Sequence, residues 1–294
     1  MKIIDFKQGT NEWKEWRLKG IGGSDAPAID GSCPYKTVRS LFLEKKKLPL
    51  VKDEDDSKEF IFNKGNEIEK IIRHAFQEKM QDSFSPICLE HDKYNYLKAS
   101  LDGLNESKGI LEAKLVGKKV IDIATAEKTI PKHHYTQIQH QLLVSGAEIA
   151  YWFGHDGKSS GAVVLIKANV EFIKILEEKE HKFWDDVLNE KIPPLSDRDY
   201  LIPEDQTLLL ELKEAVAKEK ELKKTSEELK AHAINSYGHT RIAGEGVKIY
   251  KSTRNGSIDY LEIPEIKNII KDLSPDYLES FRKKSSDVWT VSLR

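Results

Sequence analysis

Three residues that together could hydrolyse a phosphodiester bond lie close in the chain: Asp102, Glu112 and Lys114. Residues 94–102 and 109–116 have the composition of two strands, and alternation along the second sends Glu112 and Lys114 to the same face. Pairing of the two strands would bring the Asp102 carboxylate beside that of Glu112. Two carboxylates are suitable ligands for Mg²⁺ or Mn²⁺, and a neighbouring ammonium can orient a nucleophile. The pattern therefore predicts a metal-dependent phosphodiesterase centre, although a surface hairpin with a Glu112–Lys114 ion pair would have the same sequence.

A further acidic residue occurs in the helix expected over 63–81. At 100° per residue, Glu69 falls inside the apolar stripe formed by Ile68, Ile72, Phe76 and Met80. A carboxylate on a buried face is costly unless it is paired or bound to a metal. Glu69 is therefore a candidate third metal ligand, and pairing with Arg73 at the edge of the stripe is the alternative.

Glutamine and histidine side chains are concentrated in the helix that Pro131 opens and that continues to about Ser145. Gln139 falls on the stripe of Tyr135, Ile138 and Leu142, whereas Gln137 by itself says little, because glutamine is a common solvated helix residue. The histidines lack the spacing of a zinc-binding helix, since His133 and His134 diverge around it and His134 and His140 are not four apart.

A glycine-rich bend over residues 20–25 follows a helix that contains Arg17. Ser24 or Asp25 can cap the next helix, whose first N–H groups would then present an anion site. Arg17 and Ser24 are accordingly candidate phosphate ligands. A packed turn with a surface arginine explains the same residues.

The composition limits the function classes. The 294 residues contain 47 Lys and Arg against 49 Asp and Glu, so any grip on DNA requires a local basic surface or a metal. Two cysteines, Cys33 and Cys88, favour a reducing, cytoplasmic setting. Neither a leader segment nor an apolar run of about 20 residues indicates export or a membrane. The glycine patterns of Rossmann and P-loop sites are also not matched.

The order of expected elements is helix, strand pair, helix, strand pair, helix, which indicates an α/β or α+β fold with a central mixed sheet flanked by helices. We expect a catalytic domain over 1–195, because a helix near 170–189 ends before Pro193 and Pro194. Residues 196–294 form a C-terminal extension of unknown role. It is expected to contain a long charged helix near 204–233, a β-hairpin turning at Asn255–Gly256 and a terminal helix.

Six sequence blocks occur in a recognisable order: GTNEWKEWRLKGIGGSDAPAI, CPYK, GNEIE, LDG, LEAK and HHYTQIQHQ. Over about residues 8–190 the chain thereby resembles the lambda-type phage exonucleases, also called the YqaJ-like viral recombinase family. These proteins belong to the PD-(D/E)xK nuclease superfamily. The resemblance implies a restriction-endonuclease-like core.

The resemblance also implies roles for individual residues. Asp102, Glu112 and Lys114 take the catalytic places, and Leu101 stands where the motif usually has proline. The other implied residues are Glu69 as an additional metal carboxylate, Gln137 and Gln139 as the supporting glutamine motif, and Arg17 and Ser24 as phosphate ligands. The family residue that receives the DNA 5′ phosphate has no clear counterpart in this chain, and Lys118 and Lys119, downstream of the motif lysine, are the candidates.

The activity implied is Mg²⁺-dependent 5′ to 3′ digestion of one strand of linear duplex DNA, with Mn²⁺ as a possible substitute. It would release mononucleotides and leave a 3′ overhang for a single-strand annealing partner, and the family implies a ring-shaped homotrimer. Two alternatives stay open. One is an endonuclease of a restriction or defence system with the same centre, and the other is a non-catalytic DNA-binding module for recombination.

Overall fold

The computed structural model describes residues 1–48, 68, 70–158, 160–239, 241–251, 263 and 266. The chain divides into two compact units, Met1–Ile202 and Pro203–Arg294, and each is described by itself. Glu69 and the Asn255–Gly256 turn lie outside the described residues, as does the expected terminal helix.

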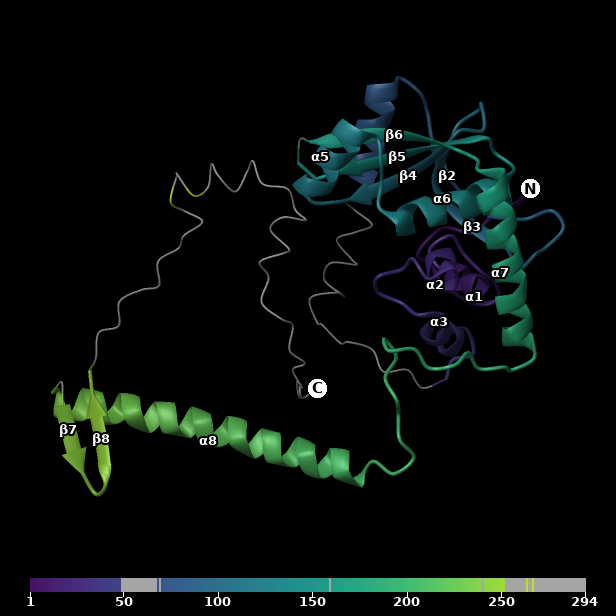
Figure 1. Ribbon diagram of the computed structural model, residues 1–294. Helices are drawn as coiled ribbons and strands as arrows, with labels where there is room; N and C mark the ends of the chain where they lie inside the picture. The colour runs from purple at the N-terminus through teal and green to yellow at the C-terminus, as the bar shows by residue number, and fades with distance from the viewer. Residues whose placement is uncertain are drawn as a thin grey trace. The chain divides into compact units, whose positions relative to one another are not determined.

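The first unit is built on a six-stranded sheet whose strands lie side by side in chain order. Figure 1 shows β4, β5 and β6 of this sheet next to one another. Every neighbouring pair is antiparallel except β4 and β5, which are parallel. The predicted central mixed sheet is therefore confirmed. The strands are β1 (Lys2–Ile4), β2 (Ser85–Glu90), β3 (Lys98–Leu104), β4 (Ile110–Leu115), β5 (Ile149–His155) and β6 (Gly161–Lys167).

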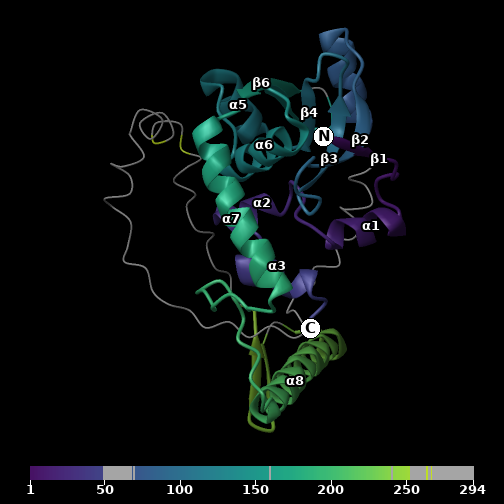
Figure 2. The same ribbon diagram turned by 90° about the vertical axis from the view of Figure 1, so that its right-hand side faces the viewer.

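Five helices share one hydrophobic core with one face of this sheet, and Figures 1 and 2 show α6 and α7 side by side. They are α2 (Ala26–Asp30), α3 (Val38–Lys45), α5 (Lys118–Glu127), α6 (Lys132–Ser145) and α7 (Val170–Leu188). A second core, which includes Phe76 from the helical residues 70–80, covers the other face. Ile110 and Leu111 belong to different cores, as alternation along a strand requires.

Local signals explain several helix ends. The side chain of Thr10 caps α1 (Asn11–Leu18) by accepting from the N–H of Trp13. Pro131 precedes α6, where a helix needs no N–H donor, and Gly146 ends it with a φ of +67°. The predicted helices over 131–145 and 170–189 are thereby confirmed.

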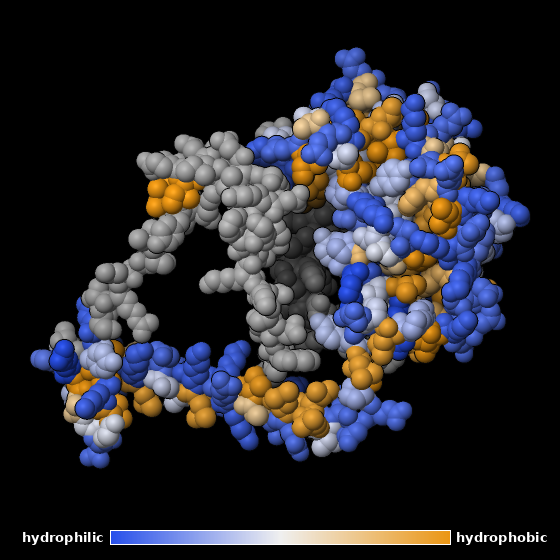
Figure 3. Space-filling model, in the orientation of Figure 1, coloured by the Kyte–Doolittle hydropathy of each residue, from blue (hydrophilic) through white to orange (hydrophobic). Residues whose placement is uncertain are grey.

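The second unit contains α8 (Thr207–Tyr237), which has no buried residue. Figure 3 shows polar side chains interrupted by apolar ones along it. The hairpin of β7 (Arg241–Gly244) and β8 (Val247–Tyr250) follows. It turns at Glu245–Gly246, where both φ values are positive, as a two-residue hairpin turn favours. Within the described residues, no helix is both long and apolar enough to cross a membrane.

Candidate active site

The carboxylate of Glu112 is buried under α6. Glu112 and Lys114 lie on the same face of β4, and Ala113 packs in the core on the opposite face. The Lys114 ammonium lies 2.5 Å from Oε1 of Glu112. Because Glu112 is only 1% exposed, the alternative of a solvated surface ion pair is wrong.

Two glutamines of α6 complete the surroundings of this carboxylate. Nε2 of Gln137 donates to Oε1 of Glu112 at 2.6 Å, and Nε2 of Gln141 donates to Oε2 at 2.5 Å. The two amides are four residues apart and therefore lie on one side of the helix. A carboxylate only accepts hydrogen bonds, so both amides must present nitrogen. Oε1 of Gln141 is then buried without a hydrogen-bond partner in the described part of the chain.

Gln139 does not take part in this cluster. Its Nε2 donates to the carbonyl of Lys167 at 2.9 Å, and its Oε1 accepts from the N–H of Asn169 at 2.8 Å. The pairing of Gln137 with Gln139 at the site is therefore corrected to Gln137 with Gln141. The reason is that residues two apart on a helix point about 200° apart, whereas residues four apart nearly align.

Asp102 lies in a β-bulge. Ser85 and Ile87 of β2 are two residues apart, but their partners in β3, Leu104 and Leu101, are three apart. The extra residue falls at positions 102–103, and such bulges re-aim side chains next to active sites. Oδ2 of Asp102 accepts from the N–H of Ala113 at 2.8 Å, which places this carboxylate against the residue that follows Glu112.

The bulge is supported from both sides. The carbonyl of Asp102 accepts a hydrogen bond from the Arg73 guanidinium at 2.9 Å. A Cβ on Gly103 would lie 2.6 Å from Cβ of Phe84, so this position excludes a larger residue. The pairing of β3 with β4 is recorded only at Gly103–Leu111 and Leu104–Ile110. The strands thus pair next to the bulge, where Asp102 reaches across to β4.

The glycine bend packs directly against the two site glutamines. A Cβ on Gly23 would lie 3.3 Å from Cγ of Gln141 and 3.4 Å from Cγ of Gln137. In the next position, the hydroxyl of Ser24 accepts a hydrogen bond from the Arg17 guanidinium. The structure therefore brings both predicted phosphate ligands to the same side of the site as α6.

The predicted anion site at a capped helix is not present, because α2 has only five residues and Asp25 makes no side-chain cap. The Asp25 carboxylate instead accepts from the N–H of Gly22 at 3.0 Å and from the Lys45 ammonium at 2.7 Å. Burial raises the pKa of Asp25, but Lys45 and Arg17 outweigh it and hold the pKa well below its usual range. Asp25 is thus a buried anion that fixes the bend.

Two histidines at the start of α6 lie near the lysine. Burial lowers the pKa of His134 to about 3, and the Lys114 ammonium contributes. Nδ1 of His134 accepts a hydrogen bond from the Trp152 indole at 3.2 Å, which fits a neutral ring. Burial also lowers the pKa of His133, and Lys114 lowers it further. Both histidines are thus disfavoured as cations beside Lys114.

The remaining candidates lie elsewhere. Lys118 and Lys119 are exposed in the first turn of α5, and the Lys118 ammonium lies 2.7 Å from a carboxylate oxygen of Asp122. Glu69 is not described, and its role stays a prediction. Among the described residues, no group of three or more His, Cys, Asp and Glu side chains has a geometry that could hold a metal.

The residues present nevertheless fit Mg²⁺ or Mn²⁺. Asp102 and Glu112 supply hard oxygen atoms, and Mg²⁺ in proteins often has only one or two carboxylate ligands because it keeps several waters. The partnerless buried Oε1 of Gln141 also fits a further hydrogen-bond donor near Glu112, such as a coordinated water.

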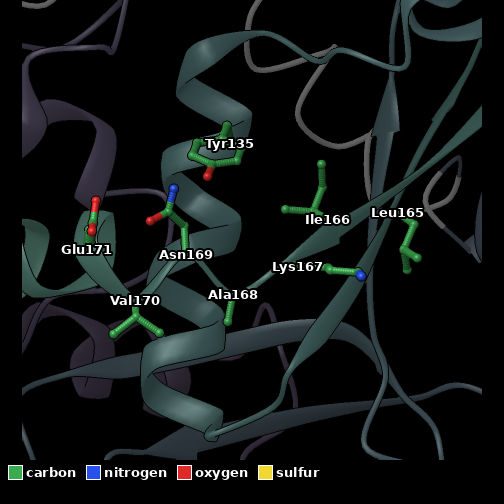
Figure 4. A pocket seen from close by; sticks show the side chains of 8 residues that line it. All are labelled: Tyr135, Leu165, Ile166, Lys167, Ala168, Asn169, Val170 and Glu171. Carbon is green, nitrogen blue, oxygen red and sulfur yellow. The ribbon is translucent and has the colours of Figure 1, made fainter.

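A shallow hollow of about 530 Å³ lies on another side of α6, where its lining residues include Tyr135, Lys167 and Asn169 (Figure 4). Lys167 and Asn169 are the partners of Gln139. The hollow therefore lies on the Gln139 side of α6, away from the side that holds Glu112, and we assign it no part in the chemistry.

Comparison with solved structures defines the fold class. The alkaline exonuclease LHK-Exo from Laribacter hongkongensis superposes with a TM-score of 0.52 at 16% identity, over 62% of this chain and 94% of that one. The crystal structure of LHK-Exo in complex with dAMP gives the same values. The first unit thus has a fold similar to that of this alkaline exonuclease, which agrees with the fold that the resemblance implied.

Sequence comparison gives two further similarities. Residues 12–148 match the model of the YqaJ-like viral recombinase domain. The chain is also 30% identical over 192 residues to the uncharacterized protein YqaJ of Bacillus subtilis (strain 168). That match covers 63% of this chain and 59% of the relative.

Proposed function

We propose that this protein is a metal-dependent deoxyribonuclease that degrades linear duplex DNA from its ends. The observation that carries the proposal is the buried Glu112 carboxylate, which is held by Lys114, Gln137 and Gln141 next to the bulge of Asp102. A carboxylate pair with an adjacent ammonium suits phosphodiester hydrolysis. The fold shared with alkaline exonucleases and the recombinase domain support the same reaction class.

Each side chain has a distinct task in this proposal. Asp102 and Glu112 would hold Mg²⁺ or Mn²⁺, which when bound lowers the pKa of water and offsets phosphate charge. Lys114 donates to Oε1 of Glu112 and orients the attacking water, and its charge also stabilises the transition state. The amides of Gln137 and Gln141 fix the carboxylate in one orientation.

The finer features rest on the resemblance to lambda-type exonucleases. They are 5′ to 3′ polarity, release of mononucleotides, a 3′ overhang for an annealing partner and assembly as a homotrimer. In this proposal the Arg17 guanidinium and the Ser24 hydroxyl, which already contact each other, bind a phosphate of the DNA end. Local contacts of this kind bind the DNA, because a net charge of −2 does not attract it.

The test uses linear duplex DNA with a labelled 5′ phosphate, beside closed-circular DNA and in Mg²⁺ or Mn²⁺. We expect acid-soluble mononucleotide from the linear DNA alone. Lys114→Ala should lower the rate by about 10²- to 10⁴-fold because it removes the group that orients the nucleophile. Its circular dichroism should match that of the wild type, and Lys174→Ala, which removes an exposed lysine of α7, is the matched control.

Other results would lead to different conclusions. Cutting of the closed circle would replace the exonuclease by an endonuclease with the same centre. Absence of cutting in both metals, with DNA still bound, would favour the non-catalytic module. Equal rates for Lys114→Ala and the wild type would remove Lys114 from the mechanism.

A further inference from the structure

The segment between α2 and α3 carries a tyrosine that the proposed chemistry does not use. The side chain of Tyr35 is 87% exposed. A single exposed apolar residue is normal and needs no explanation by itself. What distinguishes Tyr35 is the anchoring of its loop and its position relative to Glu112.

The loop is held on both sides of Tyr35. The N–H groups of Ser32 and Cys33 both donate to the carbonyl of Pro27, at 2.9 and 3.0 Å. The Ser32 hydroxyl lies 3.2 Å from that of Thr136 on α6. After the tyrosine, Thr37 begins α3 with a capping box. Tyr35 therefore extends into solvent from a loop with fixed ends.

A row of side chains on α6 connects Tyr35 to the site. His133, Gln137 and Gln141 are each four residues apart and share one side of the helix. Gln137 and Gln141 hold the Glu112 carboxylate. The ring of His133 meets that of Tyr35 edge-on, with centroids 6.2 Å apart and an angle of 87° between the planes.

The spacing along this row gives an approximate distance between Gln137 and the ring of Tyr35. Four residues of helix rise by about 6 Å, so His133 lies about one turn from Gln137, and the ring of Tyr35 lies 6.2 Å from the ring of His133. Stacked bases of one strand are about 3.4 Å apart. An aromatic ring no more than about 12 Å from a phosphodiester bound beside Gln137 is therefore within reach of a nucleoside at most about four positions along the same strand.

We propose that Tyr35 is a substrate-contact residue, whose ring stacks on a nucleobase of the DNA strand that is being cut. The proposal rests on the proposed function and assigns Tyr35 the task of holding the strand end beside Glu112. Every base has an aromatic face, so this contact is tolerant of sequence. That tolerance suits an enzyme that must digest any sequence.

The experiment combines protein variants with two forms of a short linear duplex. In one, the nucleotide at the digested end carries its base, and in the other it is an abasic analogue. Tyr35→Leu keeps an apolar side chain but removes the ring, and Tyr35→Trp keeps a ring. On the normal duplex, we expect Tyr35→Leu to lower kcat/KM by about 5- to 150-fold, mainly through KM, and Tyr35→Trp to keep it.

On the abasic duplex, wild type and Tyr35→Leu should have equal kcat/KM, because the stacking partner is missing in both. Ile175→Ala, at a 55% exposed apolar residue of α7, should equal the wild type on both substrates. An unchanged rate for Tyr35→Leu on the normal duplex would overturn the proposal. An equal loss on both duplexes would overturn it as well.

A binding measurement separates this proposal from the proposed function. The duplex carries 2-aminopurine at its end, and Lys114→Ala is compared with Lys114→Ala/Tyr35→Leu. Quenching that depends on Tyr35 would support stacking even if the wild type cut no DNA, in which case only the nuclease proposal would fail. Equal fluorescence in both complexes would overturn stacking even if the wild type is an active nuclease.

Discussion

Two sides of the same helix, α6, carry polar side chains with different tasks. On one side, Gln137 and Gln141 hold the Glu112 carboxylate. On the other side, which faces the core, Gln139 joins α6 to the start of α7. The ring of His140 lies there between Glu180 and Lys98, with Nδ1 2.7 Å from the Glu180 carboxylate and Nε2 2.9 Å from the Lys98 carbonyl. The comparison teaches that a buried polar residue indicates a reactive site only when its hydrogen-bond partner is itself a candidate catalytic group.

The two sides also differ in charge. Both ring nitrogens of His140 face oxygen atoms of Glu180 and Lys98, an arrangement that favours the imidazolium form of this buried ring. Burial lowers the pKa of His140, but Glu180 outweighs it and raises the pKa above its ordinary value. His134, by contrast, is neutral beside Lys114. We infer that the core side is built for stability and the site side for reactivity.

The largest expected effect concerns the buried ion pair of the core side. Glu180→Leu should lower the free energy of unfolding by about 3–5 kcal/mol, because it leaves His140 without its counter-charge. Urea unfolding followed by circular dichroism measures this loss. Glu178→Leu, at an exposed position of α7, is the matched control and should change stability by less than about 0.5 kcal/mol. Equal losses of stability in the two variants would contradict the stabilising role of the His140–Glu180 ion pair.

Two glutamine variants test the division of tasks directly. Gln141→Met should weaken Mn²⁺ binding, measured by calorimetry, by about 10- to 100-fold, because Glu112 loses a supporting donor. Gln139→Met should leave Mn²⁺ binding unchanged. It should instead lower the free energy of unfolding by about 1–3 kcal/mol, because the Asn169 N–H and the Lys167 carbonyl lose their partner. If Gln139→Met weakened Mn²⁺ binding as strongly as Gln141→Met, the division of tasks between the two sides of α6 would be wrong.

A smaller effect is expected from pH. An unfolded histidine binds a proton near pH 6.5, whereas folded His134 does so only near pH 3. The folded state is therefore destabilised as pH falls through this window, by about 2 kcal/mol between pH 7 and 5. His134→Gln keeps an acceptor for Trp152 and should lack this part of the loss. Urea unfolding of both proteins at the two pH values measures the difference, and equal pH dependence would contradict it.

The sequence was most informative where geometry is local. Alternation along β4 placed Glu112 and Lys114 on one face correctly, and the helix signals at Pro131 gave α6 its bounds. Sequence could not show which polar side of α6 faces Glu112, because that depends on the tertiary packing of the helix. Gln141 was missed for this reason, although its spacing of four from Gln137 was a usable signal.

The sequence did not predict the bulge at Asp102, for a different reason. Its presence follows from the register of β3 against β2, and β2 was itself not predicted. Strands β1 and β2 and helices α3 and α5 were likewise missed. The strand predicted over 94–102 runs instead from Lys98 to Leu104, because pairing with β2 and β4 rather than composition sets its ends.

The same bulge makes β3 intolerant of changes in length. Leu101 and Leu104 both pack in the core under α6 although they are three residues apart, which a regular strand would not allow. Deleting one residue at 102–103 would restore a regular strand with Leu101 and Leu104 on one face, but it would remove the Asp102 carboxylate or the glycine that fits against Phe84. Insertions are therefore expected to be tolerated in the 105–109 turn and rejected at 102–103, where the position of the Asp102 carboxylate depends on the bulge.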